Sequence, residues 1–527
     1  MLFNSVVFLV VFLPLALGGF QLACKLGRRP AGIWLIAMSV LFYGWEEPRF
    51  IPVLLVSMIG NFIIVNLIAR AHARPTLQNW ILGLGIAANI AALVWFKYLY
   101  VMLTSLAGLG VLHGPFRHVT LPLGISFFTF TQIGYLIDYR QGITKDRGVF
   151  NYLLFVSFFP HLVAGPILHN REIMPQFGDR ETYRLRTENL AIGFTIFMIG
   201  LAKKVLLADP LSTDVIAGFN DPAGLGLFSS WHIALAYSLQ LYFDFSGYTD
   251  MAIGLARLFN IRFPLNFNSP YKAGAIIDYW QRWHMTLTRY LTLYLYNPAA
   301  LWITRRRMAK GLGTGRRDLA TPRGYLAMLV VPTIYTMALA GIWHGAGSQF
   351  VIFGLLHGIY LSINHGWRIF RKKHGAKNQG AKPKAHARPA IWTVVLTYLC
   401  VLVGSIFFRA HSSGDALTVL WGMLGGHGVE ALPAWPASLD AALDDKSFLY
   451  PIIDVVWLLA LYCIVFGMPN TQQIMILADP ALGKIQPGRF KLLQWQPTWQ
   501  WALVGGAGAV VAVLGVGGMS EFLYFQF

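Results

Sequence analysis

His344, a histidine between glycines, is the residue of this sequence best suited to chemistry. It stands in segment 341–347, which reads GIWHGAG, and the pair His357-Gly358 follows after the next apolar run. An ionisable side chain within apolar sequence is costly to place in a membrane, so it is a functional candidate by default. An imidazole with a pKa near neutrality can act as a general base. On one continuous helix, the spacing of His344 and His357 is a rotation of about 220°, so the two histidines are not expected to share a face.

A second candidate site is segment 278–284, which reads DYWQRWH and follows the turn-forming residues around Asn268. Asp278 and Arg282 are four residues apart, so they can pair on a helix. Trp280 and His284 are expected to share a face for the same reason. Two interpretations stay open: an interfacial helix with an aromatic belt, and a polar site facing a cavity. His284 is accordingly either a functional histidine or a polar group that bonds neighbouring helices.

The composition shows which kind of protein must position these residues. The chain has 527 residues, 56% hydrophobic and 12% charged, with a mean hydropathy of +0.54, whereas a soluble domain carries about 25% charged residues. The net charge of +19 comes from Lys and Arg in short loops, which is the positive-inside pattern of membrane proteins. We therefore expect these loops to meet anionic lipid headgroups, and we expect no nucleic-acid partner.

Apolar runs near the ~20 residues that cross a bilayer recur along the chain. The first residues carry no basic side chain, which argues against a cleaved signal peptide. Lys25, Arg28 and Arg29 follow the first run, which predicts an outward-facing, periplasmic N-terminus. The predicted spans cover approximately residues 5–24, 32–46, 50–69, 79–103, 190–208, 225–243, 390–408, 448–467 and 500–517.

Two strongly basic segments bracket the His344 region. Residues 304–324 contain seven Lys or Arg against one Asp, and residues 368–388 contain eight with no acid. Both are predicted to be cytoplasmic loops. The residues between them, about 325–367, must cross the membrane and return, and they have room for two helices. His344 falls at the junction of these helices, so it is expected at or below the outer membrane surface.

Two apolar segments, 121–130 and 158–167, are interrupted by Pro and Gly. Irregular backbone at membrane depth is tolerated only inside protein or along a water-filled cavity. The segments therefore predict broken or re-entrant helices beside a cavity, with kinked helices satisfied by their neighbours as the alternative. The three cysteines, Cys24, Cys400 and Cys463, lie in apolar runs without CxxC spacing. Neither a metal site nor a disulfide framework is predicted from them.

Taken together, these motifs resemble the membrane-bound O-acyltransferase (MBOAT) family, and within it the bacterial alginate O-acetyltransferase branch. A teichoic-acid D-alanylation branch is more distantly similar. The matching stretches occur in the family's order over one domain, 1–527, with a motif-rich core at 119–367. They are Met1–Ser5, Pro122–Phe130, Phe158–Ile167, Tyr242–Asp250, Asn266–Ala273, Asp278–His284, Gly341–Ala346, His357-Gly358 and Tyr524–Phe527.

The resemblance implies an all-α polytopic bundle of about 11–13 transmembrane helices around a central cavity, with re-entrant or broken segments. It implies that His344 is the catalytic histidine and that His284 is a second functional histidine in the cytoplasmic half. Further residues are expected to line the cavity or contact substrate: Trp343, Asp278, Arg282, Trp283, Asn268 and His357.

The resemblance also implies an activity in the bacterial inner membrane. Acetyl-CoA on the cytoplasmic side would be the acyl donor, with no bound cofactor or metal. The acetyl group would cross the membrane to an exported, alginate-like or other polysaccharide, directly or through a periplasmic SGNH-type transfer protein.

Other functions stay open at this point. D-alanyl transfer to a teichoic-acid-like polymer is one. A secondary transporter would also have broken helices around a polar site, but no internal repeat is visible. A lipid-linked glycosyltransferase would call for acidic motifs in a loop outside the membrane, and the sequence offers no convincing one.

Overall fold

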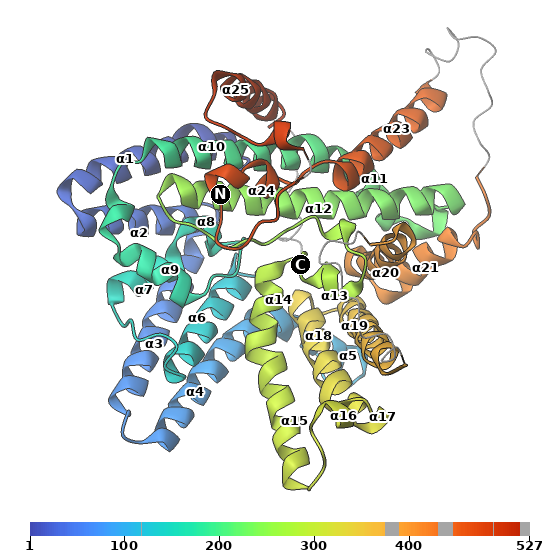
Figure 1. Ribbon diagram of the computed structural model, residues 1–527, viewed down its shortest axis with the longest axis horizontal. Helices are drawn as coiled ribbons and strands as arrows, with labels where there is room; N and C mark the ends of the chain where they lie inside the picture. Colours follow the sequence, from blue (N-terminus) through green and yellow to red (C-terminus); the bar gives the residue numbers. More distant parts are fainter. Residues whose placement is uncertain (117–118, 375–388, 431–445, 489, 517–527) are drawn as a thin grey trace. The chain divides into compact units, whose positions relative to one another are not determined.

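The computed structural model is built of helices (Figure 1). It describes residues 1–116, 119–374, 389–430, 446–488 and 490–516. Over this range the only β-type pairing is a single bridge between Pro264 and Leu482. The predicted all-α polytopic class is therefore confirmed.

Six helical stretches among the described residues are long and apolar enough to cross a membrane. They are Phe8–Leu26, Pro48–Arg70, Pro75–Gly108, Thr187–Asn220, Pro322–His344 and Ile391–Arg409; two shorter apolar helices cover Pro451–Gly467 and Trp499–Leu514. Seven of these eight match spans predicted one by one from the sequence, and Pro322–His344 is the first helix of the predicted pair at 325–367. The predicted spans at 32–46 and 225–243 also form helices, α2 (Arg28–Gly44) and α12 (Leu227–Leu258). The total of 11–13 spans stays a prediction.

The described chain divides into two compact units that alternate along the sequence. Unit 1 contains Met1–Leu206, Phe245–Asn266 and Thr471–Phe527, and unit 2 contains Leu207–Asp244 and Phe267–Asn470. Helix α12 contributes to both, since the boundary falls within it. The units are therefore not successive domains, and the interpretation of the chain as one domain stays a prediction.

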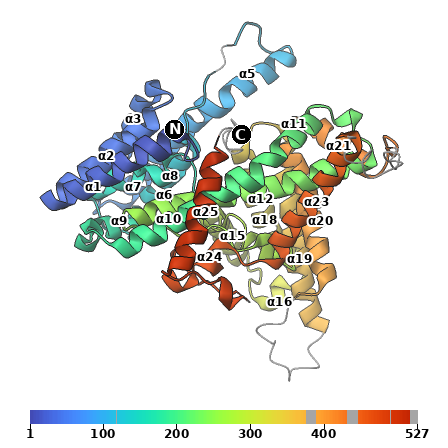
Figure 2. The same cartoon turned by 90° about the horizontal axis from the view of Figure 1, so that it is seen from above.

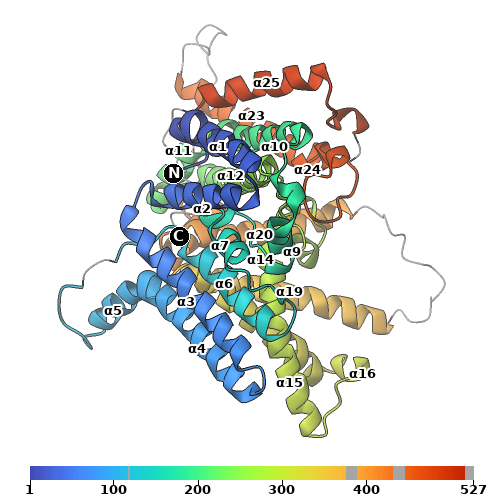
Figure 3. The same ribbon diagram turned by 90° about the vertical axis from the view of Figure 1, so that its left-hand side faces the viewer.

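Unit 1 is a set of helical hairpins, in which α1 packs on α2 and α3 on α4 (Figure 3). Phenylalanines fill its interior, with Phe8, Phe12, Phe42 and Phe159 in mutual ring contact. Its helices are α1 (Leu13–Leu26), α2, α3 (Ile51–Arg70), α4 (Pro75–Leu93), α5 (Leu99–Gly108), α6 (Ile125–Arg140), α7 (Val149–Ser157), α8 (Phe159–Leu162), α9 (Asn170–Gly178), α10 (Thr187–Ala202), α24 (Thr471–Ile474) and α25 (Trp499–Leu514).

The two interrupted segments of unit 1 lie against each other. Gly124 adopts a left-handed φ of 70° immediately before α6. A Cβ atom there would lie 2.5 Å from the carbonyl oxygen of Leu162, where the chain leaves α8. Both the φ value and the close approach require glycine. The predicted helix breaks are thus present, and they bring two non-helical backbone stretches together.

Unit 2 contains the predicted site. Its centre is a run of three helices in alternating directions, α18 (Val331–His344), α19 (Ser348–His374) and α20 (Ile391–Arg409), in which α19 contacts both others (Figures 1 and 2). Its other helices are α11 (Ser212–Asn220), α13 (Ile276–Trp280), α14 (Met285–Leu291), α15 (Asn297–Ala309), α16 (Arg316–Leu319), α17 (Pro322–Tyr325), α21 (Ser413–Met423) and α23 (Lys446–Gly467).

The basic segments are more helical than predicted. The arginines at 305–307 belong to the last turns of α15, not to a loop. Cations at a helix C-terminus are favoured by the helix dipole, and Arg306 also lies over the ring of Trp302 at 4.0 Å. The second basic segment begins inside α19, which continues to His374; the remainder of it, 375–388, lies outside the described residues, as does the terminal aromatic segment.

Candidate active site

His344 is the last residue of α18, and its side chain is buried among aromatic rings. Gly345 leaves the helix with an extended backbone, and α19 begins at Ser348. The ring of His344 lies 4.8 Å from Trp343, 4.9 Å from Phe408 and 5.9 Å from Phe353, each at a steep angle. The predicted helix junction at His344 is confirmed. Because rings surround it, the imidazole is held in one place away from bulk solvent.

Glycines allow α18 and α19 to approach closely beneath this junction. A Cβ atom on Gly341 would lie 2.2 Å from the carbonyl oxygen of Phe350, and one on Gly354 would lie 2.3 Å from that of Met337. Backbone cannot yield as a flexible side chain can, so both positions need glycine. This is the small-residue packing of membrane helices. Gly341 and Gly354 therefore set the spacing of α18 and α19, on which the position of His344 depends.

His357 is linked to His344 through one ring. Phe353 lies 5.9 Å from His344 and 4.7 Å from His357. The rotation of about 220° expected for one continuous helix does not apply, because the helix ends at His344 and the two residues belong to different helices. Trp280 Nε1 donates a 3.3 Å hydrogen bond to His357 Nδ1. The structure thus connects the two sequence motifs, 341–347 and 278–284, through His357.

An aromatic stack holds segment 278–284 in place. The rings of Tyr271, Trp283, Tyr279 and His357 follow one another at centroid distances of 6.3, 5.8 and 6.3 Å, and each successive pair is within 13° of parallel. All four side chains are buried. Trp283 therefore has a fixed position, and so does the backbone that leads into His284.

His284 occupies the N-cap position of α14 in a strained backbone conformation. Its φ and ψ are 42° and 52°, a left-handed region that non-glycine residues rarely enter and that often marks functional sites. Trp280 ends α13 before this turn, so the predicted shared helix face of Trp280 and His284 is wrong. His284 is 1% exposed. Burial lowers the pKa of His284 to about 3, which keeps its imidazole neutral at neutral pH.

Three further predicted residues brace this turn. Arg282 Nε lies 2.8 Å from Asp278 Oδ1, which is the predicted pair, although Arg282 lies beyond the end of α13. The Asn268 N–H donates to the carbonyl of Arg282 at 2.9 Å. Asn470 donates to Asn268 Oδ1 at 3.0 Å. Asp278 and Arg282 are both about one-third exposed, so their ion pair contributes at most about 1 kcal/mol and mainly sets geometry.

A pocket of about 270 Å³ adjoins the turn within unit 2. Trp280, the hydrogen-bond partner of His357, lies in its wall together with threonines of α14 and α18. Its lining is Ile277, Trp280, Gln281, Thr288, Leu291, Thr292, Tyr296, Thr333, Thr336, Met337, Leu361 and His365. An apolar pocket with several hydroxyls suits a ligand that is itself partly polar.

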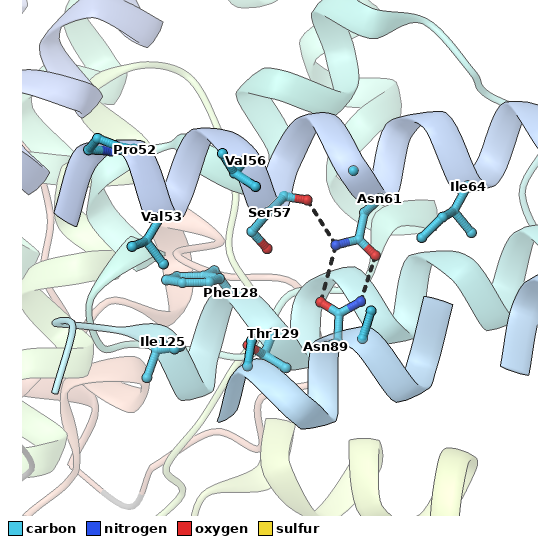
Figure 4. Close-up of a pocket in the computed structure, with 13 residues that line it drawn as sticks. Pro52, Val53, Val56, Ser57, Asn61, Ile64, Asn89, Ile125, Phe128 and Thr129 are labelled. Carbon is cyan, nitrogen blue, oxygen red and sulfur yellow. Dashed lines mark hydrogen bonds between the residues drawn. The ribbon is translucent and has the colours of Figure 1, made fainter. Parts of the chain in front are cut away.

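A second pocket, of about 470 Å³, lies between α3, α4 and α6 in unit 1 (Figure 4). None of the predicted site residues lines it. Its polar groups, Asn61 and Asn89, face each other and exchange two hydrogen bonds, of 3.1 and 2.7 Å. This pair ties α3 to α4 and leaves the pocket otherwise apolar.

The site could not be fully anticipated. Residue spacing does not predict Phe353 and Phe408 as contacts of His344, because their proximity follows from helix packing.

In the part of the chain that the structure describes, no group of three His, Cys, Asp or Glu residues could hold a metal ion. The predicted absence of a resident metal stays a prediction.

Comparison with known proteins gives the class. The sequence model of the MBOAT, membrane-bound O-acyltransferase, family matches residues 80–314, a range that includes His284 and ends before His344. The peptidoglycan O-acetyltransferase of Helicobacter pylori is 36% identical over 457 residues, 81% of each chain. The probable alginate O-acetylase AlgI of Azotobacter vinelandii is 37% identical over 431 residues, 80% of this chain and 77% of its own.

A more distant relative is the teichoic acid D-alanyltransferase of Bacillus subtilis, 28% identical over 263 residues, which cover 50% of this chain and 63% of the relative. The chain belongs to the membrane-bound O-acyltransferase family. It is a multi-pass membrane protein and an acyltransferase.

Proposed function

We propose that this protein moves an acetyl group from acetyl-CoA to a hydroxyl of an exported cell-surface polysaccharide, directly or through a periplasmic SGNH-type transfer protein. The observation that carries the proposal is the buried His344, held at a helix end by aromatic rings in a chain of this family. The relatives that cover four-fifths of the chain include a peptidoglycan O-acetyltransferase and a probable alginate O-acetylase, which supports acetyl as the group and a glycan as the acceptor.

His344 acts as the general base in this proposal. It accepts the proton of the attacking hydroxyl as the oxygen bonds to the thioester carbonyl carbon. The carbon–sulfur bond then breaks, and CoA leaves with the proton that the imidazole returns to sulfur. Such proton transfers contribute about 10²–10⁴ in rate. An alternative sequence, in which the imidazole itself first carries the acetyl group, has the same overall balance.

The donor enters from the cytoplasmic end. The basic helix ends at 305–307 and the basic segment that begins in α19 provide positive charge for the phosphates of CoA. The pocket beside Trp280 is lined by hydroxyls and apolar groups, which fits the alternation of amides and methylenes in a pantetheine arm. His284 stays neutral because of its lowered pKa, so it can accept or donate one hydrogen bond without carrying charge.

D-alanyl transfer is the second candidate. The D-alanyltransferase relative aligns with half of this chain, and the chemistry at His344 would be unchanged, because both donors are thioesters. Only the donor's carrier and the acceptor would differ.

The test uses purified protein in lipid nanodiscs with radiolabelled acetyl-CoA and, separately, a labelled D-alanyl carrier thioester. Wild type is compared with His344→Ala, and His72→Ala is the control, since His72 is exposed in a turn after α3. CoA release that requires His344 but not His72 supports the proposal. Turnover of the D-alanyl donor but not of acetyl-CoA would show that the transferred group is D-alanyl. Turnover that persists in His344→Ala would refute the role of this histidine.

A further inference from the structure

Arg409, the last residue of α20, is a buried cation that has no counter-ion among the residues that the structure describes. Its side chain is 7% exposed. Over the residues that the structure describes, the guanidinium makes neither a hydrogen bond nor an ion pair, and its Nε atom is fully enclosed. Removing a charge from water without a partner is strongly unfavourable in a protein. An ionisable group in such a position on a membrane helix marks a functional site by default.

Two buried polar side chains of α12 also have atoms without a hydrogen-bond partner among the described residues. The ring of Phe219 lies 5.3 Å from the Arg409 guanidinium carbon and 5.7 Å from the ring of Tyr237. Tyr237 is fully buried, and its hydroxyl has no hydrogen-bond partner in the described parts of the chain; the same is true of Gln240 Oε1, one turn further along α12. Within the described residues, the Arg409 guanidinium and the Tyr237 phenol therefore both lie close to Phe219, and each has hydrogen-bonding capacity that no protein group fills. Buried polar groups are almost always paired, so this group is incomplete without a ligand.

The group lies at the same end of the helices as His344. Phe408, next to Arg409, is in ring contact with His344 at 4.9 Å. Gln349, just after the His344 turn, donates to the carbonyl of His411 at 3.0 Å. Because α18, α19 and α20 alternate in direction, the ends of α18 and α20 coincide. The basic segments that suit the phosphates of CoA lie at the opposite ends of these helices.

Two partly buried cations of unit 1 show the more usual arrangement, in which the charge has a partner. Lys203 Nζ lies 2.7 Å from Asp250, which also accepts hydrogen bonds from Thr471 and Gln472. Arg262 is paired with Asp479 at 2.5 Å. Each of these cations is neutralised within its unit, whereas the charge of Arg409 is left for a ligand.

We propose that Arg409, with Tyr237, binds a carboxylate of the acceptor glycan and so directs acetyl transfer to acidic sugars. The inference rests on the proposed function, because it assigns the acceptor of that reaction. A guanidinium presents paired N–H donors that match a carboxylate, and the phenol can donate to the same group. Arg409 lies next to Phe408, which contacts His344, and at the ends of α18 and α20 that are opposite to the basic segments. We therefore assign the bound anion to the acceptor and not to the phosphates of CoA.

The experiment compares two acceptors that differ only in charge. Oligomannuronate and its carboxyl-reduced counterpart carry the same ring hydroxyls, and acetyl transfer to each is measured in nanodiscs with wild type, Arg409→Gln and Arg409→Lys. Arg262→Gln is the control for loss of a paired arginine. We expect Arg409→Gln to raise KM for oligomannuronate at least tenfold, with KM for acetyl-CoA within twofold and partial recovery in Arg409→Lys. The reduced oligomer should be a poor acceptor that the substitutions do not affect.

A rise in KM for acetyl-CoA, an equal loss with both oligomers, or unchanged kinetics would each overturn the inference. Binding is measured separately by fluorescence anisotropy of labelled oligomannuronate in the His344→Ala background, with and without Arg409→Gln. A tenfold loss of binding supports recognition by Arg409 even if wild type fails to acetylate the oligomer, an outcome that would count only against the proposed function. Binding that does not depend on Arg409, or that phosphatidylglycerol in the nanodisc displaces, would overturn the inference.

Discussion

The amide pair of Asn61 and Asn89 and the guanidinium of Arg409 are both polar groups buried on apolar helices, and they differ in how their donors are used. Each amide nitrogen of the pair donates twice, once to the other asparagine and once to a carbonyl of its own helix. Arg409 donates to no group among the described residues. The difference separates a polar pair that joins two helices from a polar group prepared for a ligand.

The surroundings of the two groups support this distinction. The asparagines border an apolar pocket that contains no candidate catalytic residue (Figure 4), and polar pairs of this type join membrane helices with about 0.6 kcal/mol per hydrogen bond. Arg409 lies one residue from a ring that contacts His344. Substitutions in the first region should therefore change stability, and substitutions in the second should change activity.

The largest expected effect on activity comes from substitution of His344, which lies in the same region as Arg409. His344→Ala should lower acetyl transfer by at least ~100-fold, because general-base catalysis supplies about 10²–10⁴. Thermal unfolding in detergent should be measured in parallel, because removal of a buried ring that contacts Trp343, Phe353 and Phe408 also lowers stability, and turnover is compared at a temperature at which both proteins are folded. Asn89→Leu should keep at least half of wild-type activity. A His344→Ala enzyme with more than a tenth of wild-type turnover would contradict the assignment.

The next largest effect is expected from substitution of Gly341, which sets the close packing of α18 on α19. Gly341→Ala should destabilise the protein by about 1–3 kcal/mol, as overpacking of a tight core does, because the new methyl would meet the Phe350 carbonyl. Activity should fall with it, since α18 carries His344. The matched control is Gly60→Ala on α3, where a Cβ atom meets nothing within 4 Å. Equal unfolding temperatures for the two variants would show that α18 and α19 are not tightly packed.

A double-mutant cycle measures the asparagine pair. Asn61→Leu and Asn89→Leu should each cost about 1–2 kcal/mol, since each leaves a buried amide without its partner. The double variant should cost less than the sum, by roughly 0.6–1.7 kcal/mol. The measurement is unfolding monitored by tryptophan fluorescence in detergent, with acetyl transfer measured in parallel. Simple additivity would mean that the two amides do not interact, and a selective loss of transfer would place them in the active site.

The smallest effect concerns Glu430. Burial raises the pKa of Glu430, but hydrogen bonds to its carboxylate together outweigh this effect and lower the pKa to about 2. They come from the Ser229 hydroxyl and from the N–H groups of Ser229 and Phe228, the latter two at 3.0 and 2.9 Å. A depressed carboxyl pKa stabilises the folded state above the unfolded-state pKa, and this stabilisation is lost as pH falls toward the folded-state value.

Wild type should therefore lose unfolding temperature between about pH 4.5 and 2 more steeply than Glu430→Gln. At pH 7 the variant should be slightly less stable than wild type. Parallel pH profiles for the two proteins would show that the carboxylate does not hold the start of α12.

The sequence predicted the limits of the helices better than the contacts between side chains. The hydropathy of α20 gave its limits to within one residue, because an apolar run ended by Arg409 is an unambiguous signal. The charge bias placed His344 at a helix junction. The shared face of Trp280 and His284 failed, because it assumed a continuous helix where a left-handed residue begins a new one. Backbone geometry of this kind depends on tertiary packing, here the aromatic stack around Trp283, and has no signature in residue spacing.

The position of Arg409 is unusual in the sequence itself. A basic residue at the predicted outer end of a span runs against the positive-inside rule, and that alone distinguishes it from the arginines of 304–324. The sequence could not show that Arg409 has no counter-ion among the described residues. That property depends on α11 and α12, nearly 200 residues earlier in the chain, and on their rings and hydroxyls around the guanidinium.

The contact of Glu430 with the start of α12 has a consequence for how the protein is made. The first N–H groups of a helix have no partner within the helix, and here a residue 202 positions later supplies the acceptor. The ribosome delivers the N-terminal part of a chain first, so the start of α12 is complete only after α18 to α21 have been synthesised. A chain that stalls before residue 430 would leave the first N–H groups of this 32-residue helix without the acceptor that they have in the finished protein.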